Sequence, residues 1–362
     1  MPLARGQPPW KEKKMVNRFL ALMAAVAFSA IASSAQAFDH PGHMVTANIA
    51  FAEIERARPD LIEKMGLLFL AHPQTAPFWV AAGEAKGTER VRRMFLEGAR
   101  WADDNKFRPD DRLTWHSARW AVVAKDAPPE AKAAVEARGG KPAGQAIEAL
   151  ELNFGTVANP ESSPAERALA LGWVLHIMGD IHQPMHVSDL FSEDFPTGNG
   201  AGSMSYVMDP VTQTPITLHI LWDSNNLRTP SLEEVDRATQ AYMKKHPRSS
   251  FPELEKHPLS EPEFFKKWAL ESHQVAKDWA FDLKTLPDPN KDQPAEKLVE
   301  GMVKFILYGI SPVKEAPELP AGYWEKLQAT TERRLTLAGY RIADLLLSAA
   351  DQIEAQRKFV GY

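Results

Sequence analysis

One stretch, LGWVLHIMGDIHQPMH at residues 171–186, constrains the fold of this chain most strongly. It is apolar almost all round a helix, and a helix with that pattern is buried. His176 and Asp180 lie four residues apart and therefore point from one face of that helix. A buried carboxylate beside a buried imidazole is costly unless each is paired or bound to a metal. Pro184 then disturbs the helix, and His186 follows just beyond it.

The rest of the chain also has the pattern of helices. Residues 161–168, ESSPAERA, contain a Ser-Pro-x-Glu helix start. Four further segments have apolar residues at helical spacing: residues 42–58, 88–102, 264–281 and 330–352. Strand patterns are few, and residues 192–217 form the longest predicted loop. No repeat or linker divides the chain, so we predict one all-α domain over residues 38–362.

The first 37 residues have the pattern of a secretory signal peptide. KEKKMVNR is basic, FLALMAAVAFSAIA is a short apolar run, and AQA before Phe38 is a small-residue cleavage site. We therefore predict a leader over residues 1–37 and a secreted or periplasmic mature chain that begins at Phe38. The apolar run is too short for a good membrane span, so no anchor is expected after cleavage. An uncleaved membrane anchor is the alternative.

Charge and composition exclude several classes of site and partner. Residues 1–37 contain five basic residues and one acidic residue, so cleavage changes the formal net charge from -5 to -9. That charge is a poor match for a protein that holds long duplex nucleic acid by a basic patch. The chain has no cysteine, which excludes disulfides, thiolate zinc sites and cysteine nucleophiles. No protein partner is evident, and we expect a monomer.

A second His/Asp pair supports a metal site. His219 and Asp223, in TLHILWDS, repeat the four-residue spacing in another apolar setting. Three more potential ligands precede them: His43, Asp103 and His116. A single pair of this kind is more often a hydrogen-bonded core pair. Two pairs together with His186 favour a metal site instead, and His/Asp sets are typical of zinc, but the spacing leaves the number of ions open.

The segment LHIMGDIHQPMH closely resembles the signature of the zinc-dependent, single-strand-specific nucleases of fungi, plants and bacteria, whose fold the zinc phospholipases C share. Further similar motifs follow in the family's order: FDHPGH, RWAD, TWHS, TLHILWD, WALES and AGYRIA. The resemblance covers nearly the whole mature chain. It implies a helical phospholipase C/nuclease-type fold with long loops around a cleft that holds three zinc ions.

The resemblance also implies which residues bind each ion. One site would use Asp103, His116, His176 and Asp180. A second would use His186, His219 and Asp223. The third would use the α-amino nitrogen and carbonyl oxygen of Phe38, with His43 and again Asp180. Asp180 would then bridge two ions, and activity would require removal of the leader.

The implied reaction is hydrolysis of single-stranded DNA and RNA to 5′-phosphate ends. A 3′-nucleotidase activity on nucleotides would follow from the same chemistry. Zinc ions bind phosphate and lower the pKa of a water toward ~7. By the same resemblance, Asp103 would orient the attacking water as well as bind zinc. Lys106 stands where the family commonly has a basic residue that stabilises the transition state, and a solvated surface lysine is the equal alternative.

The chain departs from the family at several positions. Phe38 stands where the family usually begins with Trp, and Ser117 stands where an aromatic residue commonly stacks on the base. The disulfides of the fungal members cannot form. Residues 198–200, Gly-Asn-Gly, match the family's glycine-rich loop only loosely. His182 is expected to lie behind the ligands or at the surface.

Two other functions remain open at this point. A zinc phospholipase C acting on phospholipid headgroups would share the fold and the metals. Those enzymes tend to have Glu at the position of Asp223, so this residue favours a nuclease. A non-catalytic zinc-binding protein is the second alternative, and a set of ligands with open positions argues against it.

Overall fold

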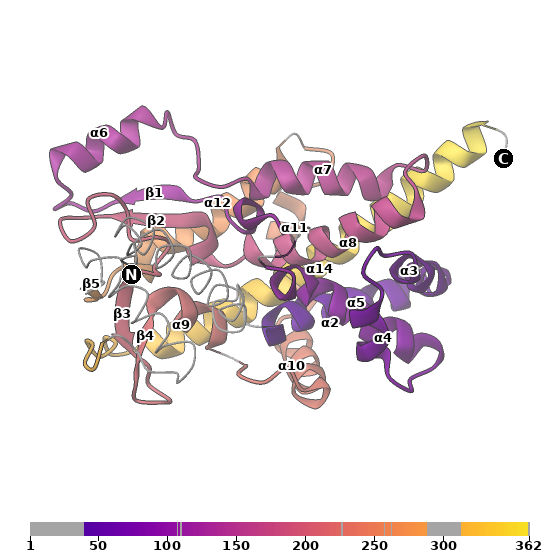
Figure 1. Cartoon of the computed structure of the whole chain (residues 1–362), viewed down its shortest axis with the longest axis horizontal. Helices are drawn as coiled ribbons and strands as arrows, with labels where there is room; N and C mark the ends of the chain where they lie inside the picture. The colour runs from indigo at the N-terminus through magenta and orange to yellow at the C-terminus, as the bar shows by residue number, and fades with distance from the viewer. Residues whose placement is uncertain are drawn as a thin grey trace, which may run out of the picture.

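The computed structural model describes residues 40–360, except 107, 109–110, 226, 257, 262 and 288–312. Most of these residues are helical, which confirms the all-α prediction (Figure 1). The helices are α2 (His40–Ala57), α3 (Asp60–Leu70), α4 (Ala76–Ala82), α5 (Gly87–Asp104), η2 (Leu113–His116), α6 (Pro129–Ala137), α7 (Ala146–Ala158), α8 (Pro164–Asp180), η3 (Pro184–Val187), α9 (Leu218–Ser224), α10 (Leu232–Lys245), η4 (Arg248–Ser250), α11 (Glu253–Lys256), α12 (Phe264–Val275), η5 (Ala276–Ala280) and α14 (Tyr323–Val360). The strands are β1 (Trp120–Val123), β2 (Ser188–Phe191), β3 (Ser205–Met208), β4 (Pro215–Thr217) and β5 (Leu286–Pro287).

Helix α8 is the helix predicted to be buried, and it packs against α2, α5, α7 and α14. It begins with a capping box, in which the Ser163 backbone N–H donates to the Glu166 carboxylate at 2.8 Å. Every residue from Ala170 to Asp180 is buried. Because no face of this segment meets water, its polar side chains must find partners within the protein.

Gly179 allows α2 to approach α8 closely. A Cβ atom built on Gly179 would lie 2.6 Å from Nδ1 of His43, a separation that real side chains do not adopt. Glycine is therefore required here for packing, because any side chain would displace the imidazole of His43. This contact holds His43 beside the C-terminal turn of α8.

Two small sheets support the loops at one end of the helices. Strands β1 and β2 are parallel, with Trp120 opposite Ser188, so the segment after His116 lies beside the segment after His186. Strand β3 pairs with β4 and β5 in antiparallel fashion. The prediction of an irregular loop over residues 192–217 is therefore wrong in its second half. The strands there have three or four residues, too few for an alternating pattern, and depend on each other for hydrogen bonds.

One amphipathic helix predicted from the sequence is interrupted in the structure. The amphipathic segment 264–281 is not one α-helix, because α12 ends at Val275 and a π-helical turn follows. The predicted leader over residues 1–37 and the predicted mature N-terminus at Phe38 lie outside the described residues.

Within the described ranges, none of the helices combines the length and the apolar character that crossing a membrane requires.

Candidate metal centre

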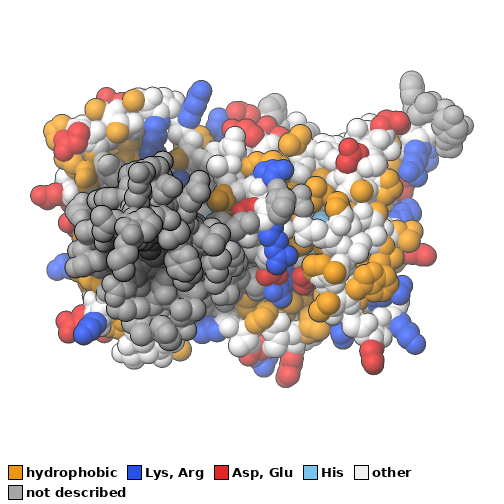
Figure 2. Space-filling model, in the orientation of Figure 1, with side chains coloured by type: hydrophobic (Ala, Val, Ile, Leu, Met, Phe, Trp, Pro, Cys, Tyr) orange, Lys and Arg blue, Asp and Glu red, His pale blue; other side chains and the backbone are white. Residues whose placement is uncertain are grey.

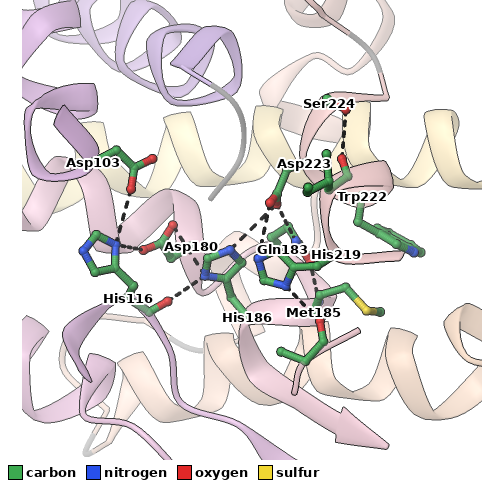
Figure 3. A network of polar contacts seen from close by, with 12 residues as sticks. Asp103, His116, Asp180, Gln183, Met185, His186, His219, Trp222, Asp223 and Ser224 are labelled. Atoms are coloured by element: carbon green, nitrogen blue, oxygen red, sulfur yellow. Dashed lines mark hydrogen bonds and ion pairs between the residues drawn. The ribbon is translucent and has the colours of Figure 1, made fainter. Parts of the chain in front are cut away.

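All eight side chains predicted as ligands converge in the structure. They fall into three groups, and within each group the nitrogen and oxygen atoms lie within 4.8 Å of one another. The groups are His43, Asp103 and His176; His116, His176 and Asp180; and His186, His219 and Asp223. Figure 3 shows members of these groups side by side, with His186 between the Asp180 and Asp223 carboxylates. Of the predicted ligands, only Phe38 lies outside the described residues.

Different helix ends supply these side chains. Asp103 lies in the last turn of α5, and His176 and Asp180 lie in the last two turns of α8. His116 is the last residue of the short helix η2, and His186 is the second-last residue of the short helix η3. His219 and Asp223 come from α9, whose first turn is capped by the Thr217 hydroxyl accepting from the Ile220 N–H. The chain changes direction where each of these helices begins or ends, so side chains at the helix ends can come together although they are far apart in the sequence.

The group of His116, His176 and Asp180, together with Asp103, surrounds the end of α8. His176 Nε2 lies 3.3 Å from Asp180 Oδ2 and 3.4 Å from Asp103 Oδ1. His116 Nδ1 lies 3.5 Å from Asp180 Oδ2 and 3.6 Å from Asp103 Oδ1. The two ring nitrogens are themselves 2.9 Å apart. Two imidazoles and two carboxylates therefore face one point in space.

The group of His186, His219 and Asp223 is centred on the Asp223 carboxylate. His219 Nε2 lies 3.3 Å from Asp223 Oδ2, and His186 Nε2 lies 3.7 Å from Asp223 Oδ1. The Gln183 amide donates to the same Oδ1 atom at 2.6 Å. This hydrogen bond restrains the carboxylate, while no described residue donates a hydrogen bond to Oδ2.

Asp180 connects the groups. Its Oδ2 atom faces His116 and His176, whereas its Oδ1 atom lies 3.4 Å from His43 Nε2 and 3.8 Å from His186 Nδ1. Neither oxygen accepts a hydrogen bond from any residue that the structure describes. The two oxygens point in different directions, which is the geometry of a carboxylate able to bridge two cations.

The histidine rings are oriented by backbone carbonyls. Nδ1 of His176 donates to the Ala99 carbonyl at 2.8 Å, and Nδ1 of His219 donates to the Ala201 carbonyl at 2.8 Å. Nδ1 of His186 likewise donates to the His116 carbonyl at 2.6 Å. A carbonyl only accepts, so each Nδ1 carries a proton, and each Nε2 faces the carboxylates, where it can bind a cation that lies between them. Metal-binding histidines are held in this way.

The donor set fits zinc. Ligand atoms at about 2.1 Å from a tetrahedral zinc ion are about 3.4 Å apart, close to most of the separations observed here. Asp180 and Asp223 also leave buried carboxylate oxygens without a hydrogen-bond donor among the described residues. Such oxygens cost several kcal/mol unless a cation compensates them. The side chains are thus suited to hold metal ions.

Lys106 lies in the centre, not on the surface. Its Nζ atom is 2.7 Å from Asp103 Oδ1, and its side chain is only 12% exposed. Burial alone would lower the pKa of Lys106, but Asp103 outweighs burial and raises the pKa above its usual value. Burial alone would raise the pKa of Asp103, but Lys106 and the histidines lower it below its usual range. The alternative of a solvated surface lysine is therefore excluded.

Some supporting residues were not predicted. Gln183, which holds Asp223, was not singled out although its amide lies between two predicted ligands in an apolar segment. Asn199 is fully buried, and its Oδ1 atom accepts from the backbone N–H groups of Leu190 and Gly202. This turn places the Ala201 carbonyl under His219. A polar side chain between glycines in a long loop is the signal that could have indicated this role.

Helix ends that converge on a cysteine-free cluster of histidines and aspartates define a class of helical proteins whose side chains could bind metal. The family model described as S1/P1 Nuclease matches residues 38–351, and the chain therefore belongs to that family. Nuclease S1 of Aspergillus oryzae (strain ATCC 42149 / RIB 40) is 31% identical to it over 127 residues. Those residues are 35% of this chain and 40% of the relative, so the match spans less than half of the relative's length.

Proposed function

We propose that this protein is an exported zinc-dependent phosphodiesterase that cleaves single-stranded DNA and RNA and leaves 5′-phosphate ends. A 3′-nucleotidase activity on mononucleotides would use the same site. Membership of the S1/P1 nuclease family supports phosphodiester hydrolysis, and the enzymes of that family use zinc. Family membership supports hydrolysis in general, and the 5′-phosphate products and the preference for single strands are our additional proposals.

The observation that carries the proposal is the position of Asp180 between two groups of ligands. Its two oxygens face different histidines at 3.3–3.8 Å, which suits a centre with more than one ion. We propose three zinc ions with the ligands assigned above. The third would need the Phe38 backbone, and the family match begins at residue 38, which supports a mature chain starting there. A leader over residues 1–37 would direct export to the periplasm or beyond the cell.

The chain's own residues would then divide the work of hydrolysis. Bound zinc would supply Lewis acidity toward the phosphate and would lower the pKa of a water. Asp103 lies beside His116, His176 and Lys106, so a carboxylate oxygen there can accept a hydrogen bond from the attacking water and orient it. Lys106 keeps its positive charge next to Asp103 and would stabilise the negative charge that develops on the phosphate.

The test uses protein that begins at Phe38. It is incubated with single-stranded DNA, single-stranded RNA and phosphatidylcholine, with and without a chelator, and the ends of the products are identified. Chelator-sensitive cleavage to 5′-phosphate ends is the expected result. Release of phosphocholine with intact nucleic acid would move the protein to the phospholipase class. Bound zinc without turnover of any substrate would contradict the proposed activity altogether.

The requirement for a free N-terminus has a separate test. Protein that starts at Phe38 is compared with protein that carries two extra alanines before Phe38. If the Phe38 α-amino group binds zinc, the extension lowers both the zinc content and the rate of cleavage. Equal zinc content and equal rates would show that the third site does not use this group.

A further inference from the structure

A groove of about 960 Å³ lies between α4, α5 and the segment that enters α10. Its lining contains three arginines and one acidic residue: Arg93, Glu97, Arg100 and Arg108. Apolar side chains supply much of the remaining wall: Met44, Pro73, Pro77, Val80 and Leu232. The predicted mature form has a net charge near -9, yet arginines outnumber acidic residues three to one among the residues that line this groove.

Several residues that line the groove are sequence neighbours of residues in the metal centre. Arg100 lies on α5 one turn before Asp103, and Arg108 follows Lys106 by two residues. Gln74 lines the groove and donates from Nε2 to Asn105 Oδ1 at 3.1 Å, and Asn105 lies between Asp103 and Lys106 in sequence. One end of the groove is therefore built from close neighbours of two residues that we place in the reaction.

Carboxylates hold two of the arginines in place. Arg93 Nε lies 2.7 Å from a Glu89 oxygen, and Arg100 Nη2 lies 2.9 Å from an Asp104 oxygen. A guanidinium has five N–H donors, so each of these contacts uses only part of it and leaves donors for a phosphate. Along α5 the two arginines are separated by roughly 10 Å, enough to meet different phosphates of one strand.

The apolar wall complements the arginines. Val80 is 81% exposed although it is aliphatic, and it lies on α4 next to Trp79, which is 48% exposed. Figure 2 shows hydrophobic side chains gathered over α3 and α4, with Lys, Arg, Asp and Glu side chains mixed beside them. Proteins that bind single-stranded nucleic acid combine a cationic groove along the backbone with side chains, mostly aromatic, that contact the bases, and the exposed Trp79 lies next to Val80 at this groove.

We propose that this groove binds the nucleotides that flank the cleaved phosphodiester, so that the enzyme acts better on longer strands than on a dinucleotide. The inference rests on the proposed nuclease function and adds to it a binding site for the substrate strand. Arg93 and Arg108 would contact phosphates of the strand, and neither belongs to the groups that would bind zinc.

The experiment measures kcat/KM on an octanucleotide and on a dinucleotide for the zinc-loaded enzyme and for R93Q/R108Q. The wild-type enzyme is expected to prefer the octanucleotide, and the double variant is expected to lose most of that preference. The dependence of log KM on log salt should also weaken, by about 0.7 for each phosphate that an arginine no longer neutralises. The matched control is R237Q, on α10 outside the groove, where the side chain is 67% exposed. It should keep the wild-type preference and salt dependence.

The outcomes separate the inference from the proposed function. Cleavage by the wild-type enzyme with no length preference, or a double variant that behaves like R237Q, would overturn the groove as a binding site and leave the nuclease proposal intact. A zinc-loaded wild-type enzyme that cleaves neither oligonucleotide would overturn both. Zinc content and thermal unfolding are measured for each variant to test whether the substitutions leave the centre and the fold in place.

Discussion

Nη1 of Arg341 lies 3.0 Å from Nε2 of His182, deep behind the metal centre. His182 is fully buried and donates from Nδ1 to the Met178 carbonyl at 2.7 Å, so its Nε2 accepts from Arg341. Burial, together with Arg334 and Arg341, lowers the pKa of His182 well below its usual value and keeps the ring neutral. Arg341 also donates twice to Glu271, at 2.8 Å each. This network supports the turn that links Asp180 to His186.

Replacing Arg341 with Met should destabilise the fold by about 3–5 kcal/mol, because it leaves the fully buried His182 and the mostly buried Glu271 with fewer partners. Urea unfolding of the zinc-loaded protein measures the change. Arg56→Met is the control, because the Arg56 side chain is 69% exposed and its ion pair with Glu53 is worth about 1 kcal/mol or less. Equal unfolding midpoints for the two variants would show that the buried network adds no stability.

Zinc content should depend on which aspartate is changed. Asp180→Asn should remove more than one zinc ion per chain, because the Asp180 oxygens face two groups of histidines. Asp223→Asn should remove one, because Asp223 belongs to a single group. Metal analysis after dialysis gives both numbers. The same loss in both variants would contradict the bridging role of Asp180.

Chelation should also lower the melting temperature of the wild-type protein, since bound metal stabilises only the folded state.

Lys106 should affect turnover and not zinc binding. Lys106→Met is expected to lower kcat on single-stranded DNA by about 10²–10³, the effect of removing one preorganised charge at a reacting centre. Lys106→Arg should recover part of the loss, because it restores the charge beside Asp103. Lys64→Met, where the side chain is 60% exposed, is the control. A kcat near the wild-type value in Lys106→Met, with zinc still bound, would assign this lysine a purely structural role.

His273 should make the protein less stable in acid. Burial, with Lys277 adding to it, lowers its pKa from 6.5 to about 4. A depressed histidine pKa means that the folded state prefers the neutral ring, so this stability is present above pH 6.5 and is lost as the pH falls toward 4. The loss cannot exceed about 1.4 kcal/mol per pH unit, and solvent screening reduces it.

The measurement is the free energy of unfolding at pH values between about 5 and 7, in saturating zinc, for the wild-type protein and His273→Asn. The variant should lose less stability on acidification. Ser188→Ala is the control, because it removes the hydroxyl 2.9 Å from His273 Nδ1 but keeps the titrating ring. It should retain the wild-type pH dependence. Parallel curves for His273→Asn and the wild-type protein would mean that this histidine does not titrate with folding.

The sequence alone determined several of the helices and the spacing of the two ligand pairs. His176 and Asp180, and His219 and Asp223, lie four residues apart, and helical geometry places each pair on one face without any distant contact. The capping box at Ser163 was equally local. The absence of cysteine also restricted any metal to His, Asp, Glu and backbone ligands. These features follow from neighbours in the chain, so a sequence pattern contains them.

The tertiary structure decided which distant residues meet. His43 stacks on His176 with ring centroids 4.0 Å apart, and this contact depends on the packing of α2 against α8 at Gly179. Lys106 could be a surface lysine by sequence, and only the position of α5 places it against Asp103. The strands within residues 192–217 and the Arg341 contact with His182 likewise join segments far apart in the chain. Such contacts arise from burial and long-range packing, which leave no periodic signal in the sequence.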